Sequence, residues 1–158
     1  MRILGLDPGS LKTGFGVLEY AGSSYNYVAS GLIRMPAKDH LPARLKVIAQ
    51  GIDELIAKYQ PDVAAIEDVF FAHNPKSTLK LGQARGAAIT AVVRHDIDVQ
   101  EYAAKLIKQA VASNGSASKD QVQFMVKNIL NIKGELKEDA SDALAVAICH
   151  AHHAGVKG

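Results

Sequence analysis

The period of the apolar residues changes partway along the chain, and this change limits the possible folds more than any other feature. Residues 41–59 carry apolar side chains at steps of three and four, the period of one face of an α-helix. These side chains are Leu41, Leu45, Ile48, Ile52, Leu55 and Ile56. Short apolar runs at 2–6, 14–20 and 25–33 precede the segment, and another at 62–67 follows it. Strand, helix and strand in this order predict a crossover unit, normally right-handed, that joins parallel strands.

One more helix and strand follow before the chain becomes helical. Turn-forming residues at 21–24 join two of the early runs as a hairpin, so the first three strands are expected to be antiparallel. Residues 75–94 are expected to form a helix and residues 97–102 a fifth strand. Further helices are predicted at 103–112, 119–130 and 139–153. We therefore predict an α/β fold with a mixed five-stranded sheet, three antiparallel strands followed by two parallel ones, and helices on both faces.

Composition restricts the class of protein. The 158 residues are 48% apolar and 22% charged, which is typical of one globular domain over residues 1–158. Cys149 is the only cysteine, so we expect no internal disulfide and a reducing compartment. Asp7 interrupts the first apolar run, which excludes a signal peptide or membrane anchor there. We expect a cytoplasmic protein with no membrane association, and a net charge of +2 does not by itself imply nucleic acid.

Four acidic residues stand where they could meet. Asp7 and Glu67 end two predicted strands, and if these strands are parallel neighbours, the side chains emerge together at the edge where α/β sheets bind ligands. Asp139 and Asp142 are three residues apart at the start of the last predicted helix, so they share a face. Convergent carboxylates need a cation, and their oxygens favour Mg²⁺ or Mn²⁺. Two such ions about 4 Å apart can activate water and stabilise the leaving oxygen in phosphodiester hydrolysis.

Each acid also has a simpler explanation when it is taken alone. Asp139 could cap a helix or interact with its dipole, and Asp7 could be a turn residue before Pro8. Neighbours on a strand face opposite ways, so either Glu67 or Asp68 faces the site, and alternation alone does not decide which. The joint placement of the acids is therefore the stronger indication.

The last predicted helix has a face of small residues behind its two aspartates. Ala143 and Ala147 share that face, while Leu144 and Ile148 supply apolar anchorage. We expect this helix to approach the sheet closely.

Basic and aromatic residues indicate a DNA-binding surface. Residues 75–94 are basic, with Arg85 among the basic residues and no acid. Residues 103–133 are also basic, with Lys105 among the basic residues and one acid, whereas residues 134–142 are mainly acidic. Lysines and arginines beside an acidic pocket suit a nuclease that holds phosphates next to a metal site, although most single lysines on helices are merely solvated. The loop pair Phe70–Phe71 could anchor a core, or one ring could stack on an unpaired base.

Several motifs together resemble the RuvC family of Holliday-junction resolvases, in order and over nearly the whole chain. They are Asp-Pro-Gly-Ser at 7–10 with Thr-Gly at 13–14, Ile-Glu at 66–67, Leu-Gly-Gln-Ala-Arg-Gly at 81–86, Glu-Tyr-Ala-Ala at 101–104 and Asp-Ala-Ser-Asp-Ala-Leu at 139–144. The sequence departs from the usual family pattern at Ser141, where Ala is usual, and at Asp68, where Gln or Glu is common. It ends at Gly158, before the basic tail of many members, so no such tail is expected to contribute to DNA binding.

The resemblance implies a ribonuclease-H-like fold and a homodimer that resolves four-way junctions by paired, symmetric nicks in recombination and repair. It implies Mg²⁺ as cofactor, with Mn²⁺ as a substitute and two ions per active site, and the RuvA–RuvB branch-migration complex as a partner. The catalytic and metal-binding residues implied are Asp7, Glu67, Asp139 and Asp142, which selects Glu67 over Asp68. The DNA-binding residues implied are Phe70, Lys108 and Lys119, to which the basic stretches add Arg85 and Lys105.

Two other functions fit the pattern less well. An actin-like ATPase shares the sheet order and the Asp-x-Gly turn, but it needs two lobes and a second phosphate loop. A non-catalytic junction-binding module would not need the four acids to be intact. Residues 115–119 lack the glycine spacing of a phosphate loop, and the Cys149–His153 segment lacks a second ligand cluster for a soft metal.

Overall fold

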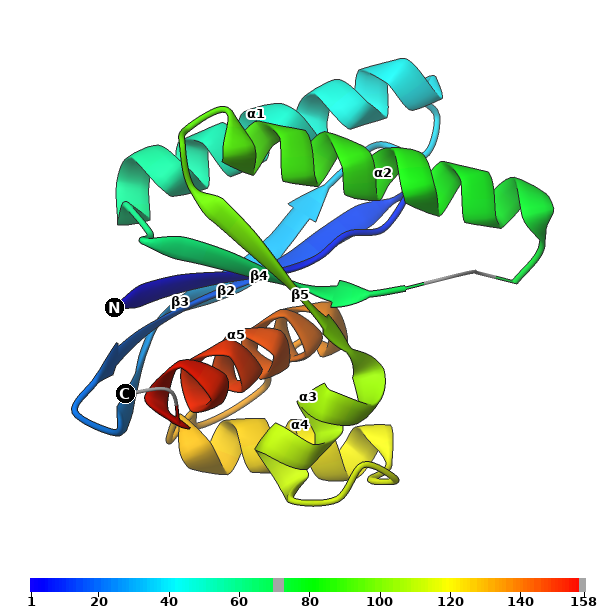
Figure 1. Ribbon diagram of the computed structural model, residues 1–158. Helices are drawn as coiled ribbons and strands as arrows, with labels where there is room; N and C mark the ends of the chain where they lie inside the picture. The colour runs from blue at the N-terminus through cyan, green and yellow to red at the C-terminus, as the bar shows by residue number, and fades with distance from the viewer. Residues whose placement is uncertain (70–72, 157–158) are drawn as a thin grey trace.

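A five-stranded sheet forms the centre of the molecule in the computed structural model, which describes residues 1–69 and 73–156 (Figure 1). The strand order is β3-β2-β1-β4-β5. The strands are β1 (Arg2–Asp7), β2 (Lys12–Ala21), β3 (Ser24–Arg34), β4 (Val63–Asp68) and β5 (Asp98–Ala103). Strands β1, β2 and β3 pair antiparallel, and β4 pairs parallel with both β1 and β5. The predicted mixed sheet is confirmed, with three antiparallel strands followed by two parallel ones.

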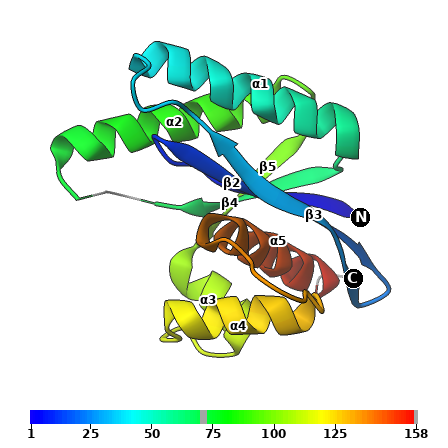
Figure 2. The same ribbon diagram turned by 180° about the vertical axis from the view of Figure 1, so that it is seen from behind.

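Helices cover both faces of the sheet, as predicted. Helices α1 (Leu41–Tyr59) and α2 (Pro75–Val93) lie side by side on one face, and α5 (Glu138–Val156) lies on the other. Helices α3 (Ala104–Ala112) and α4 (Lys119–Ile129) cover α5 from outside (Figures 1 and 2). Within residues 1–69 and 73–156, no helix has both the length and the apolarity that a bilayer span requires.

The predicted boundaries differ from the observed ones by at most a few residues. Strand β2 begins two residues earlier than predicted, because Lys12 and Thr13 pair with Arg34 and Ile33 of β3 and so extend the ladder. The apolar face of α1 is the predicted one, with Ile48, Ile52 and Ile56 among its buried residues.

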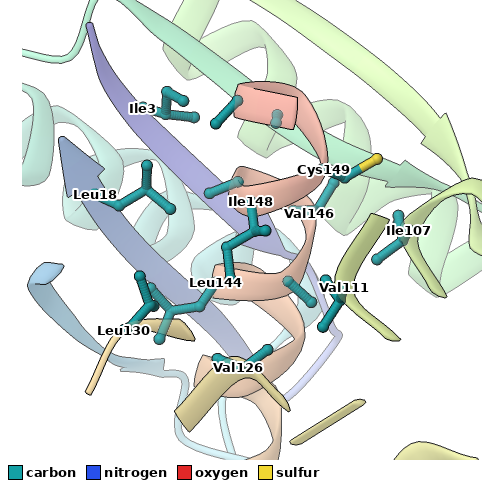
Figure 3. Packing of buried hydrophobic residues seen from close by; sticks show 14 of the residues in the cluster. Ile3, Leu18, Ile107, Val111, Val126, Leu130, Leu144, Val146, Ile148 and Cys149 are labelled. Atoms are coloured by element: carbon teal, nitrogen blue, oxygen red, sulfur yellow. The ribbon is translucent and has the colours of Figure 1, made fainter. Parts of the chain in front are cut away.

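Helix α5 is sandwiched between the sheet and the two outer helices. Figure 3 shows its Leu144 and Ile148 among side chains from the strands and from α3 and α4. Ile3 and Leu18 come from the strands, and Leu144 and Ile148 are at most 1% exposed. The predicted apolar anchorage of this helix is confirmed, and its position determines where Asp139 and Asp142 lie.

The close approach of α5 to the sheet depends on residues without bulk on both sides. A β-carbon at Gly5 of β1 would overlap the carbonyl oxygen of Ala143 and lie 3.1 Å from the β-carbon of Ala147. The expected small-residue face therefore meets a glycine, and the helix backbone rests almost directly on the strand.

Replacing Gly5 by Ala should lower the free energy of unfolding by about 3 kcal/mol, because the added methyl group meets a helix backbone that cannot turn aside. Urea unfolding followed by circular dichroism measures the change. The matched control is Gly82→Ala in α2, where a β-carbon meets nothing within 4 Å. That variant should gain about 0.5–1 kcal/mol from helix propensity. Equal stability of the two variants would contradict the close-packing argument.

Candidate active site

The carboxyl ends of β1 and β4 bring Asp7 and Glu67 to one edge of the sheet. The parallel register pairs Leu6 with Ile66, so the next residues on both strands are Asp7 and Glu67. Ile3 and Ala65 pack in the core layer that contains α5, whereas Leu6 packs in the layer of α1 and α2. By alternation, Asp7 and Glu67 lie on the α5 face and Asp68 lies on the other face. Strand register thus places Glu67, and not Asp68, on the same face as Asp7.

The first turn of α5 adds two more carboxylates to this edge. Single carboxylate oxygens of Asp7, Asp139 and Asp142 all lie within 4.8 Å of one another. Gly14 makes this possible, since a β-carbon there would overlap the carbonyl group of Asp139. Gly14 is also the register partner of Asp7, so the residue opposite Asp7 on β2 is the one that admits the start of α5. We call Asp7, Asp139 and Asp142 the carboxylate triad.

Burial and mutual repulsion disfavour full ionisation of this group. Burial raises the pKa of Asp7 to about 8, and the negative charges of Asp142 and Asp139 add to the rise. Burial is also the largest cause of the raised pKa values of Asp142 and Glu67. Three partly buried carboxylates with oxygens this close form the donor set that a hard divalent cation prefers, and its charge would remove the repulsion. The triad therefore fits a divalent metal ion.

Glu67 stands beside the triad and faces a separate hollow. A cavity of about 230 Å³ is lined by Glu67, Lys108, Lys119 and Asp142 together with Ala104, Ile107, Val122 and Ala145. The charges of Lys119 and Lys108 lower the pKa of Glu67 and so oppose the effect of burial. Two of the predicted DNA-binding lysines therefore share a cavity with two of the predicted catalytic acids.

Local structure explains where these two lysines point. Lys108 belongs to α3, whose Ile107 and Val111 are buried and orient the helix. Lys119 is the first residue of α4, and a capping box fixes that helix end: the Ser118 side chain accepts from the Gln121 amide, and the Gln121 side chain accepts from the Ser118 amide.

Lys119 is held by acids at the start of α5. Its Nζ lies 2.6 Å from Glu138 Oε1 and 3.3 Å from Asp142 Oδ2. The hydrogen bond to Glu138 is the main cause of a raised pKa for Lys119, so this side chain stays charged. Glu138 was not singled out from the sequence, although its position next to Asp139 was the available signal.

A second lysine reaches the triad from the opposite side, and it was also missed. Lys12 Nζ lies 3.2 Å from Asp139 Oδ2. The turn that leads to Lys12 is braced by the buried Arg44 of α1, whose Nη1 donates to the Ser10 carbonyl oxygen at 2.9 Å. The only signal in the sequence was that Lys12 lies five residues after Asp7, and the ladder between β2 and β3 decides where it points.

Two other basic candidates occupy structural positions. Arg85 Nη2 donates to the Glu67 carbonyl oxygen at 3.1 Å and to Glu101 Oε1 at 2.6 Å, so it ties α2 to the ends of β4 and β5. Its side chain is 16% exposed. Lys105 packs its stem against the turn at Gly115. DNA contacts by Arg85 and Lys105 stay predictions, and Phe70 lies outside the described residues.

The cysteine and histidine residues of α5 make contacts within the protein. Burial raises the pKa of the Cys149 thiol to about 12. His153 Nδ1 lies 2.8 Å from the Cys149 carbonyl oxygen, and His150 Nδ1 lies 2.7 Å from the Tyr102 hydroxyl. Across the described ranges 1–69 and 73–156, the triad is the metal-type cluster that the geometry brings out, and no cluster of this kind includes Cys149.

Comparison with known proteins agrees with the fold and extends over the site. The family model described as "Crossover junction endodeoxyribonuclease RuvC" matches residues 3–150. A protein of that name from Pseudoalteromonas translucida is 57% identical over 150 residues, which cover 95% of this chain and 86% of the relative.

Solved structures are similar over almost the full length. Thermus thermophilus RuvC in complex with a Holliday junction substrate superposes with a TM-score of 0.92 at 28% identity, covering 99% of this chain and 96% of the other. The yeast mitochondrial Holliday junction resolvase Ydc2 has a TM-score of 0.73 at 16% identity, covers 98% of this chain and 80% of the other, and supports the fold alone.

The raised pKa of Asp7 predicts how stability depends on pH in the metal-free protein. The folded state holds a proton up to about pH 8, whereas the unfolded chain releases it near the ordinary value of 3.8. This proton stabilises the fold at acidic pH, and its contribution is lost as the pH rises toward 8. In EDTA, the melting temperature should therefore fall between pH 5 and pH 9.

Asp7→Asn should flatten this dependence and raise the stability at pH 8 by on the order of 1 kcal/mol or more. Calorimetry in EDTA measures both effects, and added Mg²⁺ should stabilise the unsubstituted protein more than the variant. An identical pH dependence in the two proteins would show that Asp7 is not the group that makes stability depend on pH.

Proposed function

The chain belongs to the RuvC family of crossover junction endodeoxyribonucleases, and on that premise we propose that Asp7, Glu67, Asp139 and Asp142 form its catalytic centre. The chain is an endonuclease that resolves Holliday junctions in DNA recombination by hydrolysing phosphodiester bonds. The observation that carries the assignment of its centre is the convergence of three carboxylates within 4.8 Å at the edge of the sheet. Glu67 lines a cavity together with Asp142, one of these three carboxylates.

We propose that the four carboxylates hold Mg²⁺, or Mn²⁺ in its place. Asp7, Asp139, Asp142 and Glu67 would together hold two such ions. When bound, such ions supply an activated water as nucleophile and neutralise the charge that develops on the phosphate. The carboxylates are held in position before any ion binds, because β1, β4 and α5 are parts of one packed core. The assignment is supported by the raised pKa of Asp7, which is due first to burial and then to the negative charges of Asp142 and Asp139, a repulsion that a divalent cation would relieve.

The proposed role of Lys108 and Lys119 is to hold the phosphate backbone beside the carboxylates. Both line the same hollow as Glu67 and Asp142, so a phosphate that entered it would meet two ammonium groups. Lys119 now pairs with Glu138 and Asp142. Ions on the carboxylates would weaken its pairing with Asp142 and make its charge available to DNA. These lysines would therefore position the strand for attack.

We further propose that the protein acts as a homodimer on four-way junction DNA, and that it works with the RuvA–RuvB complex. A four-way junction presents two symmetry-related strands, and resolution requires that both are cut. A two-fold pair of subunits provides one catalytic centre for each strand.

Changing each of the four acids to its amide should abolish nicking and leave junction binding intact. Asp7→Asn, Glu67→Gln, Asp139→Asn and Asp142→Asn each remove one proposed ligand charge but no phosphate-binding cation. The loss of rate should exceed the roughly 10- to 100-fold that removal of an outer-sphere partner costs. The assay is paired nicking of a synthetic immobile junction with and without Mg²⁺, with binding measured in parallel.

Asp68→Asn is the matched control, because Asp68 neighbours Glu67 but lies on the opposite face of β4. It should retain the full rate. Near-native nicking by any of the four amide variants would remove that residue from the catalytic set.

Lys108→Ala and Lys119→Ala should each slow nicking about ten- to hundredfold, the cost of one hydrogen bond to a charged group. Each should also reduce the slope of log K against log salt by roughly 0.9. Filter binding over a KCl series gives the slope. Lys133→Ala serves as control, since Lys133 follows the far end of α4 and is exposed. If rate and slope are unchanged in the Lys108 and Lys119 variants, these lysines are solvated surface residues.

A further inference from the structure

The four proposed catalytic acids line two hollows, and the strand order sets these apart, because β4 with Glu67 lies on one side of β1 and β2 with Lys12 lies on the other. On one side is the cavity lined by Glu67, Asp142, Lys108 and Lys119. On the other side, Asp7 and Asp139 line a second hollow of about 260 Å³, whose remaining wall is the turn at residues 8–12. A DNA strand cut at the carboxylates must continue past them on both sides, and the two hollows beside the carboxylates are places where its neighbouring phosphates could bind. Only the first hollow has a cation so far assigned to the phosphate backbone.

Lys12 supplies the cation of the second hollow. Its side chain is 53% exposed, and its Nζ lies 3.2 Å from Asp139 Oδ2. The backbone at Lys12 is fixed, because it pairs with Arg34 in the ladder between β2 and β3. Gly9 packs over it so closely that a β-carbon there would lie 2.6 Å from the Lys12 carbonyl oxygen. The ammonium group therefore ends an exposed side chain on a fixed backbone next to the triad.

The pairing of Lys12 with Asp139 is easily exchanged. An exposed ion pair contributes roughly 0–1 kcal/mol, so releasing the lysine costs little. Asp139 is also a member of the carboxylate triad, so a cation held there competes with Lys12 for the same carboxylate and repels its ammonium group. Among the described residues that line the second hollow, Asp7 is the other acid with which the released ammonium group could pair, and it belongs to the same triad.

We propose that Lys12 is a phosphate-binding residue for the DNA strand on the side opposite Lys108 and Lys119. It neutralises Asp139 in the metal-free protein, and it exchanges this carboxylate for a DNA phosphate when a divalent cation binds to the triad. This inference rests on the proposed function and adds a second contact between the protein and the DNA backbone. The two groups of lysines would hold the strand on both sides of the scissile phosphate.

The test compares Lys12→Gln with the charge-retaining Lys12→Arg, and uses Lys58→Gln as the matched control. Lys58 is an exposed lysine at the far end of α1, where Arg2 at the start of β1 donates to the Tyr59 carbonyl oxygen. Junction binding is measured over a KCl series in Ca²⁺ and in EDTA, on ice, with denaturing gels to verify that the DNA is uncut. Ca²⁺ takes carboxylate oxygens as Mg²⁺ does and serves as the probe cation.

In Ca²⁺, Lys12→Gln should reduce the salt slope by roughly 0.7–0.9 and weaken binding about three- to tenfold near 0.1 M salt. In EDTA the change should be smaller, because Asp139 then competes with the phosphate for the lysine. Lys12→Arg and Lys58→Gln should match the unsubstituted protein under both conditions. One neutral methylphosphonate is also placed next to the scissile phosphate, on either side of it in turn. On the side that Lys12 contacts, it should remove the effect of Lys12→Gln, and on the other side it should leave that effect unchanged.

Two results would overturn the inference while the proposed function stands. One is an unchanged slope for Lys12→Gln in Ca²⁺. The other is an equal decrease in Ca²⁺ and in EDTA, which would show that Lys12 is a diffuse surface charge. Nicking of a junction by the unsubstituted protein in Mg²⁺ is measured in a separate assay. Failure to nick would overturn the proposed function together with this inference.

Discussion

The contact between the backbone of α5 and the glycines of β1 and β2 is the constraint on which the rest of the structure depends. Gly5 and Gly14 leave room for the carbonyl groups of Ala143 and Asp139, so at these two points the helix backbone lies directly against the strands. A side chain at either glycine would push α5 away from the sheet, and with it the aspartates that lie beside Asp7. The packing of the core therefore sets the geometry of the chemistry.

This packing has an electrostatic cost. It brings the carboxylates of Asp7, Asp139 and Asp142 within 4.8 Å of one another in a partly buried position. Burial and the negative charges of Asp142 and Asp139 raise the pKa of Asp7, while Lys12 pairs with Asp139 and Lys119 pairs with Asp142. A site arranged in this way trades stability for the ability to bind a cation, which is common where activity needs groups that repel one another. In the proposed mechanism, the same lysines then bind the phosphates of the DNA.

Much of the fold could be predicted from the sequence because the signals are local. The period of Ile48, Ile52 and Ile56 identified α1, and the strand–helix–strand order predicted a crossover to a parallel strand. The meeting of Asp7 and Glu67 depended on the further condition that β1 and β4 are neighbours, and the sheet fulfils it. The spacing of Asp139 and Asp142 put both on one helix face, and the motifs that contain these acids indicated the family.

The sequence alone thus determined the order of the elements, the residue types at the edge of the sheet and the small-residue face of α5. Only the tertiary structure decided how charges pair across the site. The pairing of Lys12 with Asp139 and of Lys119 with Glu138, and the use of Arg85 to brace β4 and β5, join residues far apart in sequence. Such pairings depend on the register between strands and on the direction of each side chain, and no local period encodes either of these. The sequence places charges in segments, and the packing of the sheet against its helices decides which of them meet.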